Sequence, residues 1–223
     1  GGPTDTIART IVGKMSQVLG QSIRIENVIG AGGTTGTTRV AHAPNDGYTL
    51  IVGHMGTHAA AVPLYPSLSY HPERDFEPVS VVAATPIVIV ARKELPPRTL
   101  REFIAYARAN TDRINMAHAG VGSASYASCE LLNRLLGIRP TGVPFGGAAP
   151  ALAAVANGQV DYICDQMVNV VPQVMAGAVK AYAVASPDRS PALPDVPTTV
   201  ETGLPAFQIQ VWNAVFVPKG TPA

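Results

Sequence analysis

The sequence predicts an α/β protein, because strand-like and helical segments alternate along nearly all of its 223 residues. The 21 glycines and 20 prolines fit the many tight turns that such an alternation needs. Hydrophobic residues make up 47% of the chain and charged residues 14%, which is enough apolar material for one large domain or two smaller ones. We therefore expect an α/β architecture with largely parallel sheets.

The first predicted element is an amphipathic helix that follows the stretch GGPTD. Apolar residues from Ile7 to Leu19 recur at helical spacing, and Gly20 supplies a stop signal. Thr4 is the expected N-cap, and Asp5 suits the positive end of the helix dipole. The glycines leave the first N–H groups open to an anion. Taken alone, however, the stretch is better interpreted as a tight turn into a helix.

The remaining elements follow in alternation along the chain. Strands are predicted at 22–28, 48–53, 77–83, 86–92, 114–120, 142–145, 160–165 and 179–186. Helices are predicted at 37–43, 57–65, 100–110, 124–137, 149–158 and 170–177. The stretch RKELPPRTL is the most linker-like part of the sequence, so we expect the chain to cross between two lobes near it.

Composition excludes several classes of function. The net charge is +1 and no basic stripe is present, which argues against a nucleic-acid partner. No apolar run approaches membrane-spanning length, and this sequence contains no signal peptide. His54 and His58 stand four residues apart without a glutamate between them, so we expect neither a metal site nor a cofactor. Cys129 and Cys164 fit one disulfide or two buried thiols equally well.

Two glycine-rich junctions are candidates for ligand binding. The segment GAGGTTG (30–36) lacks the lysine of a phosphate-binding loop, so we interpret it as a turn whose glycines permit close backbone approach. In the segment HAGVGSASY (118–126), Ser123 is suited to cap a helix, but the full nucleophile-elbow motif is absent. The helix starts at Gly1–Asp5 and Gly120–Ser123 lie on opposite sides of the linker. They could therefore face each other across a cleft and hold one anion.

Motifs along the whole chain resemble the Bug family, the periplasmic solute receptors of tripartite tricarboxylate transporters. They are, in order, GGPTD, GAGGTTG, APNDGYTL, GVGS, VPFGGAAPAL, GQVDYICD, RSPALPDVPTTVETGLP and WNAVFVPKGTP. The resemblance implies a two-lobed type II periplasmic-binding-protein fold with a ligand cleft between the lobes. The expected lobes are residues 1–91 with 212–223, and residues 92–211. In the family a first strand normally precedes GGPTD and helices follow GTPA, and we expect both to be missing from the first lobe here.

The resemblance also implies a set of ligand-binding residues in the cleft. One carboxylate of the ligand would meet the start of the first helix, and the other lobe and the segment after strand 48–53 would line the rest. The residues are Gly1, Gly2, Thr4, Asp5, Met55, Gly56, Thr57, His58, Gly122, Ser123, Ala124, Tyr126, Phe145 and Asp165. The sequence departs from the family at Tyr126, where histidine is usual, and at Gly146, where a cation is usual. We therefore expect N–H and hydroxyl groups, rather than ion pairs, to bind the ligand.

Asp5 needs a separate interpretation, because its own charge would repel a carboxylate. We expect its side chain to accept hydrogen bonds from N–H groups of the loop and to hold the loop in shape. The ligand would then meet backbone groups or bound water at this helix start.

The function implied by the resemblance is a non-catalytic receptor that binds a small organic carboxylate, either a dicarboxylate or an aromatic acid. The receptor would be a periplasmic monomer without a cofactor and would deliver its ligand to the membrane subunits of the transporter. Apolar surface from Met55, Tyr126 and Phe145 would suit an aromatic or medium-chain acid better than citrate. Two alternatives are a ligand sensor for a signalling partner and a serine hydrolase that uses Ser123 with His58 or His118.

Overall fold

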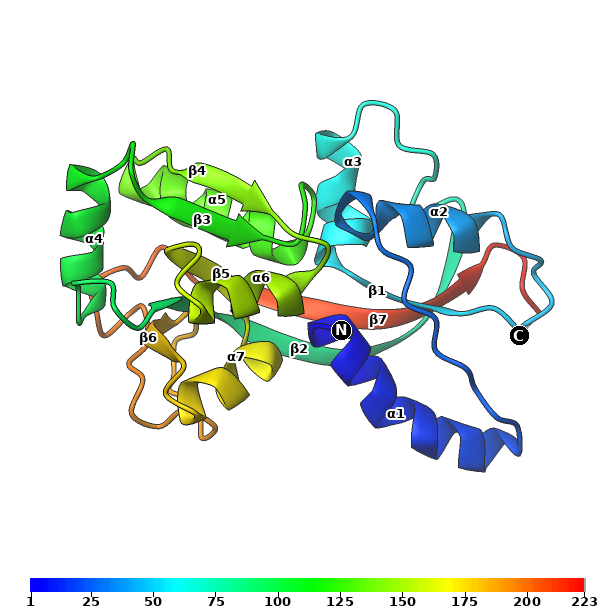
Figure 1. The fold of residues 1–223 in the computed structure, drawn as a ribbon. Helices are drawn as coiled ribbons and strands as arrows, with labels where there is room; N and C mark the ends of the chain where they lie inside the picture. Colours follow the sequence, from blue (N-terminus) through cyan, green and yellow to red (C-terminus); the bar gives the residue numbers. More distant parts are fainter. Residues whose placement is uncertain (223) are drawn as a thin grey trace.

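The computed structural model describes residues 1–222 of the chain. These residues form a seven-stranded sheet in the order β1-β7-β2-β5-β3-β4, with β6 also paired to β2 (Figure 1). The strands are β1 (Ile51–His54), β2 (Phe76–Arg92), β3 (Asn115–His118), β4 (Thr141–Pro144), β5 (Tyr162–Gln166), β6 (Val179–Val184) and β7 (Gln210–Pro218).

Seven α-helices accompany the strands within the described residues. They are α1 (Pro3–Leu19), α2 (Thr34–Ala41), α3 (Ala61–Leu64), α4 (Leu100–Ala109), α5 (Ala124–Leu136), α6 (Ala148–Ala156) and α7 (Met167–Met175). A short 3₁₀ helix, η1 (Ala31–Gly33), precedes α2, and a single π-helical turn, η2 (Gly56–Ala60), leads directly into α3. None of these helices has the length and apolar character that crossing a bilayer requires. The α/β class predicted from the sequence is confirmed.

The long strand β2 connects the two halves of the sheet. It pairs with β7 from Phe76 to Pro86 and with β5 and β6 from Ile87 to Arg92, and all of these pairings are antiparallel. Only β3 is parallel to its neighbours, β4 and β5. The expectation of largely parallel sheets is therefore wrong, because the two long strands run in opposite directions along each other and set the pairing of most of the sheet.

Three predicted strands are corrected by this arrangement. The runs 77–83 and 86–92 belong to a single strand, because Pro86 lies where β2 changes partners and interrupts neither ladder. The predicted strand 22–28 is absent: this segment is mostly exposed, and it pairs with no strand of the described chain. A segment without a hydrogen-bonded neighbour is not a β-strand.

The second half of the sheet is the middle layer of an α/β sandwich. On β2, Ile87 and Ile89 pack into the core cluster that contains α4 and α5 residues, whereas Val88 and Val90 pack into the cluster of α6 and α7. On β5, Cys164 and Ile163 divide in the same way between the two clusters. Strand side chains alternate between faces, so burial on both faces explains why these runs are apolar throughout.

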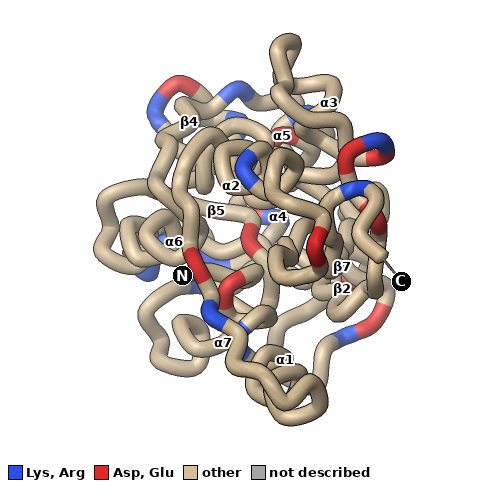
Figure 2. The backbone as a smooth tube through the Cα atoms, turned by 90° about the vertical axis from the view of Figure 1, so that its right-hand side faces the viewer, with Lys and Arg blue, Asp and Glu red and all other residues tan. Residues whose placement is uncertain are grey.

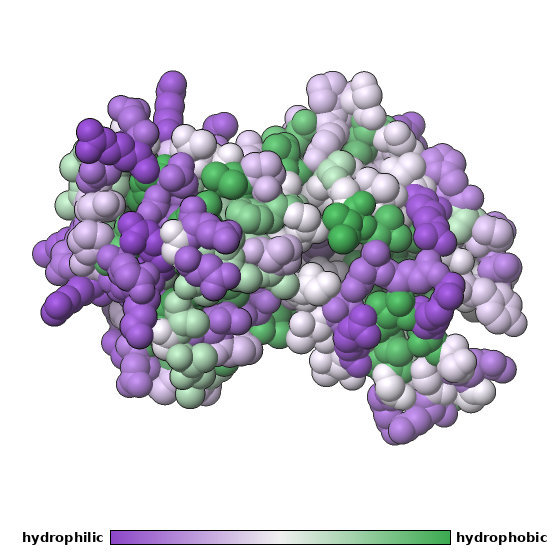
Figure 3. All heavy atoms as spheres, viewed as in Figure 1, coloured by the Kyte–Doolittle hydropathy of each residue, from purple (hydrophilic) through white to green (hydrophobic). Residues whose placement is uncertain are grey.

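The first helix differs from its prediction at its beginning. Gly2, not Thr4, is the N-cap, and Pro3 occupies the first helical position, where its missing N–H costs nothing. Gly20 ends the helix in the left-handed conformation, as predicted. Of the apolar positions, Ile7 and Ala8 are buried, while Val18 is 73% exposed. On the right-hand side of the molecule, where α1 and α2 lie, further apolar side chains gather at the surface (Figure 3).

Charged groups of both signs are interspersed along the chain, without a large patch of one sign on the face shown in Figure 2. The surface ion pairs join neighbouring groups of opposite sign, such as Lys219 with Glu77 and Arg39 with Glu26. On this face, positive and negative groups are therefore mixed and do not form an extended basic surface.

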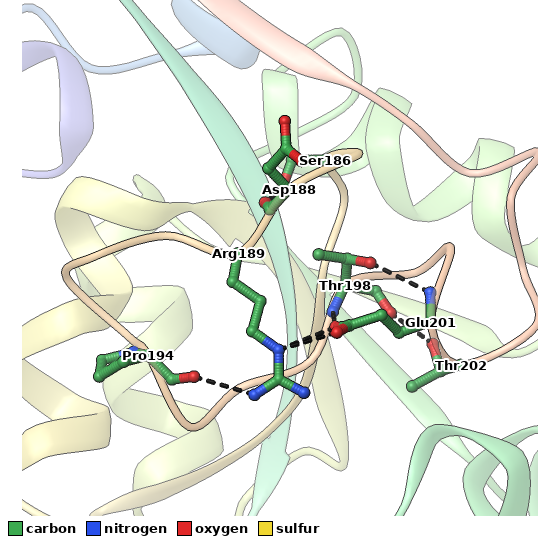
Figure 4. Close-up of polar contacts among 7 residues, drawn as sticks. All are labelled: Ser186, Asp188, Arg189, Pro194, Thr198, Glu201 and Thr202. Carbon is green, nitrogen blue, oxygen red and sulfur yellow. Dashed lines mark hydrogen bonds and ion pairs between the residues drawn. The ribbon is translucent and has the colours of Figure 1, made fainter.

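A polar network orders the long connection between β6 and β7 (Figure 4). The Glu201 carboxylate accepts hydrogen bonds from the Thr198 amide at 2.7 Å and from Arg189 at 3.0 Å, and the Thr198 hydroxyl accepts one from the Glu201 amide at 3.1 Å. This reciprocal pairing of Thr198 and Glu201 has the pattern of a capping box. These hydrogen bonds lower the pKa of the Glu201 carboxyl.

The network predicts that Thr198→Ala destabilises the fold. Thr198 is buried, so the substitution leaves the Glu201 amide without its partner and should lower the free energy of unfolding by about 1–2 kcal/mol. Urea denaturation measures the effect. Ser67→Ala, in an exposed loop, is the control and should change stability by less than about 0.5 kcal/mol. Equal stability of the two variants would contradict the structural role of the Thr198 hydroxyl.

Candidate functional site

Three glycine- or glutamine-capped helices begin close together where the two halves of the sheet meet (Figures 1 and 2). Helix α1 follows Gly2, α6 follows Gly147, and α7 follows Gln166. Gly2 packs against the start of α6 so closely that a Cβ atom there would lie 3.4 Å from the Ala148 Cβ atom. Helix starts present unpaired N–H groups and the positive end of the helix dipole, so this region favours a negatively charged group.

The segment GVGS lies against the other glycine-rich loop through backbone atoms. A Cβ atom on Gly32 would lie 2.1 Å from the Val121 carbonyl oxygen and 2.9 Å from the Ser123 nitrogen. The Tyr65 hydroxyl donates a hydrogen bond to the same Val121 carbonyl at 2.5 Å. The interpretation of segment 30–36 as a turn that permits close backbone approach is therefore confirmed, and the neighbouring backbone is residues 120–123.

The π-helical turn η2 borders the same loop. A Cβ atom on Gly56 would lie 2.6 Å from the Gly122 carbonyl oxygen, so these two predicted site residues are in contact. Met55 and Tyr126 both pack against the core cluster beneath α5. The structure thus brings Met55, Gly56, Thr57, Gly122, Ser123, Ala124 and Tyr126 into one neighbourhood.

Ser123 caps α5, as predicted. Its hydroxyl accepts a hydrogen bond from the Tyr126 amide at 3.2 Å and lies 3.2 Å from the Ser125 hydroxyl. The His118 Nδ1 atom accepts from the Gly120 amide instead, and His58 bonds to Thr57. No serine–histidine pair is therefore assembled at Ser123 within residues 1–222, and the hydrolase alternative lacks its catalytic geometry.

His58 lies with its Nδ1 atom 2.9 Å from the Thr57 hydroxyl and packs among aromatic side chains of β2 and β7. Its ring stacks on Phe216 with the ring centroids 4.1 Å apart and lies 5.0 Å from Phe76. These rings line a cavity of about 350 Å³ together with Trp212 and Glu73. Burial lowers the pKa of His58 to about 4, and burial also lowers the pKa of His54 to about 4. Both histidines are consequently neutral at pH 7.

Asp165 and Phe145 occupy the second half of the sheet. Asp165 lies near the end of β5, where its carboxylate accepts hydrogen bonds from the Gln166 amide at 2.8 Å and from the Asn169 side chain. Burial raises the pKa of Asp165 to about 6, although these two hydrogen bonds oppose the shift. Phe145 follows β4, and its ring packs against the cluster of α6 and α7.

Asp5 pairs with a side chain of its own helix. Its carboxylate lies 3.0 Å from the Arg9 guanidinium, and the hydrogen bond between them is the main cause that lowers the Asp5 pKa. The i, i+4 spacing on α1 brings Arg9 within reach, and the Asp5 Oδ2 atom also lies 3.6 Å from the nitrogen of Gly1 in the loop. That Asp5 holds the loop in shape stays a prediction.

A buried polar chain links the start of α1 to the start of α7. The Thr4 hydroxyl donates to the Asn213 Oδ1 atom at 3.2 Å, and the Asn213 Nδ2 atom donates to the Gln166 Oε1 atom at 3.1 Å. Thr85 on β2 donates to the same Gln166 oxygen at 2.9 Å. Sequence reasoning found only Thr4 among these residues. The available signal was Asn213, a polar residue within the apolar run VWNAVFV of β7.

Cys129 and Cys164 are free, buried thiols, so the structure has the second of the two alternatives considered for them. The Cys129 sulfur accepts a hydrogen bond from the Cys164 amide at 2.9 Å. Within residues 1–222 no group of three histidine, cysteine or acidic side chains is placed to hold a metal ion.

A family model described as "Tripartite tricarboxylate transporter family receptor" matches residues 7–223. A relative from Agrobacterium vitis, a "UPF0065 protein in the TAR-I ttuE-ttuC' intergenic region", is 42% identical over the whole chain. The chain spans 64% of that relative's length.

Two solved structures share the fold along the whole chain. One is "MatC (Rpa3494) from Rhodopseudomonas palustris with bound malate", with 58% identity, a TM-score of 0.96 and 76% of that chain covered. The other is the "Structure of periplasmic binding protein BugD", with 42% identity, a TM-score of 0.96 and 74% of that chain covered. The periplasmic-binding-protein fold expected from the motifs is confirmed.

The two partly buried histidines, His54 and His58, predict that acid destabilises the protein. Between pH 6.5 and about 4 the unfolded chain binds protons on His54 and His58 that the folded chain does not, so stability should fall as the pH falls. Asp165 acts in the opposite direction between about pH 4 and 6, because the folded chain holds its proton more tightly. Where all three groups titrate, the effect of two histidines is opposed by that of one carboxyl group. The free energy of unfolding should then fall by about 1.4 kcal/mol for each unit by which the pH is lowered.

Urea denaturation at several pH values measures this dependence. In His58→Phe the neutral ring keeps its place on Phe216, so the loss of stability in acid should be smaller than in the parent protein. Ser67→Ala, in an exposed loop, removes no titratable group and is the control, so it should leave the pH dependence unchanged. A His58→Phe variant with the parent's pH dependence would show that His58 does not titrate as described.

The contact between the glycine loops predicts opposite effects for two glycine-to-alanine changes. Gly32→Ala places a methyl group against the Val121 carbonyl at a φ of +64°, and should cost at least about 1–2 kcal/mol in the free energy of unfolding. Gly13→Ala, in open space on α1, should instead stabilise the protein by about 0.5–1 kcal/mol. Denaturation of both variants gives the comparison, and a stable Gly32→Ala would contradict the backbone contact.

Proposed function

We propose that this chain, which belongs to the tripartite tricarboxylate transporter receptor family, is a receptor that binds a small dicarboxylate and delivers it to the membrane subunits of such a transporter. The observation that carries the proposal is the meeting of α1, α6 and α7 at their N-terminal ends beside two glycine-rich loops. The bound malate of the MatC structure, 58% identical to this chain, supports a C4 dicarboxylate as the ligand.

The proposed cleft lies between the two lobes expected from the sequence, residues 1–91 with 212–223 and residues 92–211. The Gly1–Asp5 helix start and the η2 turn belong to the first lobe, while the GVGS loop, Phe145 and Asp165 belong to the second. Contacts of Gly2 with Ala148 and of Gly32 with Val121 support this proposal, because each joins one lobe to the other.

The proposed binding mode uses neutral donors. None of the fourteen predicted site residues is a lysine or arginine, so backbone N–H groups, hydroxyls and side-chain amides would carry the interaction with the anion. The receptor acts as a monomer in the periplasm, where the relatives' fold is used for solute binding, and it returns its ligand chemically unchanged. Citrate, with a third carboxylate, fits this set of donors less well than malate.

Calorimetric titration with malate, succinate, adipate, benzoate and citrate tests the function. We expect a dicarboxylate to bind most tightly, and at about one hundred times its Kd to stabilise the protein by about 2.7 kcal/mol. The NMR spectrum of malate after prolonged incubation with the protein should be unchanged. Absence of binding to every acid, or conversion of malate, would contradict the proposal.

The helix start at Gly2 gives a specific variant. Gly2 has a φ of +116° and lies within van der Waals distance of α6, so Gly2→Val should move the first N–H groups of α1 and weaken malate binding by at least about tenfold. Gly13→Val, on the exposed part of α1, is the control and should bind malate as the parent does. Circular dichroism of both variants establishes that they are folded, and equal affinities would leave GGPTD as a simple turn before a helix.

A further inference from the structure

Gln166 stands out among the polar residues that the proposed binding mode does not yet use. It is the last residue of β5 and the N-cap of α7, and it is only 3% exposed. Its side chain contacts residues of two other strands, Thr85 on β2 and Asn213 on β7. Asn213 is fully buried and in turn accepts from Thr4 in the first turn of α1.

The hydrogen bonds of Gln166 determine which end of its carboxamide is available. Both Thr85 and Asn213 donate to the Oε1 atom, at 2.9 and 3.1 Å, so the carbonyl oxygen is satisfied twice. The Nε2 atom has no hydrogen-bond partner within residues 1–222. It is also not one of the fully buried side-chain atoms that lack a hydrogen bond. The amide nitrogen therefore reaches space that a ligand or water can occupy.

The position of this free donor matches the proposed cleft. Gln166 follows Asp165, a predicted site residue, and it precedes the first N–H groups of α7. Through Asn213 it is tied to Thr4, which lies two residues after Gly2 at the other helix start. A nearly buried N–H₂ group without a partner is costly unless a ligand or water accepts from it.

We propose that the Gln166 carboxamide is a ligand-contacting, specificity-determining residue that donates from Nε2 to a carboxylate oxygen of the dicarboxylate. This inference rests on the proposed function. Thr85 and Asn213 orient the amide so that it presents a donor, and an anionic ligand is attracted to a donor rather than to a carbonyl oxygen. A fixed neutral amide supplies recognition without the desolvation cost of a buried lysine or arginine.

Three variants of the full chain test the inference by calorimetric titration with malate. Gln166→Met removes the donor at similar volume and should weaken binding by about tenfold or more, as expected for a hydrogen bond to a charged group. Gln166→Glu keeps the acceptor for Thr85 and Asn213 but replaces the donor with a negative charge. At pH 8 it should therefore weaken malate binding more than Gln166→Met does. Thr85→Val leaves the Nε2 donor and the hydrogen bond from Asn213 in place, so it should weaken malate binding by less than about threefold.

The pH profile separates recognition from a purely structural effect. At pH 5.5 protonation of the carboxyl group introduced by Gln166→Glu restores a donor, so the deficit of this variant relative to the parent should narrow, whereas that of Gln166→Met should stay constant. Asp165 adjoins position 166, so the carboxyl group introduced by Gln166→Glu should raise the Asp165 pKa further. Gln166→Met introduces no charge, so its pH profile gives the contribution of Asp165 and Asp5 without the introduced carboxyl group. Thermal unfolding without ligand shows whether each variant is folded. If Gln166→Met does not fold, Gln166→Glu still tests the inference.

Three results would overturn the inference. It fails if Gln166→Met binds malate as tightly as the parent, if Thr85→Val loses as much affinity as Gln166→Met, or if the deficit of Gln166→Glu does not depend on pH. In these cases the parent protein still binds malate, and the proposed function stands. If the parent binds none of the dicarboxylates, the proposed function itself fails and the inference with it.

Discussion

The direct contact between two backbone segments constrains the rest of this molecule. Gly32 approaches the Val121 carbonyl so closely that no side chain of any size fits between them. This contact and the Tyr65 hydrogen bond fix the GVGS loop against η1 and η2, and thereby the start of α5. At the neighbouring junction, Gly2 lets α1 begin against the first turn of α6. Glycine is required at these places because close approach and left-handed backbone leave no room for a Cβ atom.

Electrostatics at this junction depends on dipoles and hydrogen bonds rather than on full charges. The predicted site residues are mostly glycine, hydroxyl and apolar residues, and Asp5 is paired with Arg9 on α1. Asp165 is buried with its carboxylate hydrogen-bonded, so its charge is not freely available either. An anion arriving among helix starts therefore meets oriented N–H groups whose positions are already fixed by the fold. Such preorganised donors bind a carboxylate without a large rearrangement of the protein.

Local patterns in the sequence predicted most helices and their caps, because these depend on residues close in the chain. Ser123 and Gly137 delimit α5 as their residue types require. The pairing of strands was harder to predict: nothing local in 77–92 shows that one strand spans both halves, and the strand predicted at 22–28 has no partner. The polar chain through Asn213 and Gln166 joins residues 47 positions apart, so only the assembled fold brings it together. Partner choice is a property of tertiary structure, whereas caps and periodicity are properties of the local chain.

The continuous strand β2 has a consequence for how such receptors can change during evolution. Its first part pairs with β7 and its second part with β5 and β6, so a single segment of backbone is a core strand of both halves. Neither half can be excised or exchanged between relatives as an independent module without dividing that strand. The loops and helix starts can therefore change in sequence without dividing this strand. Recombination at the centre of the sheet would divide it and is disfavoured. In such a fold, point substitutions in the loops leave this strand whole, whereas a domain exchange would divide it.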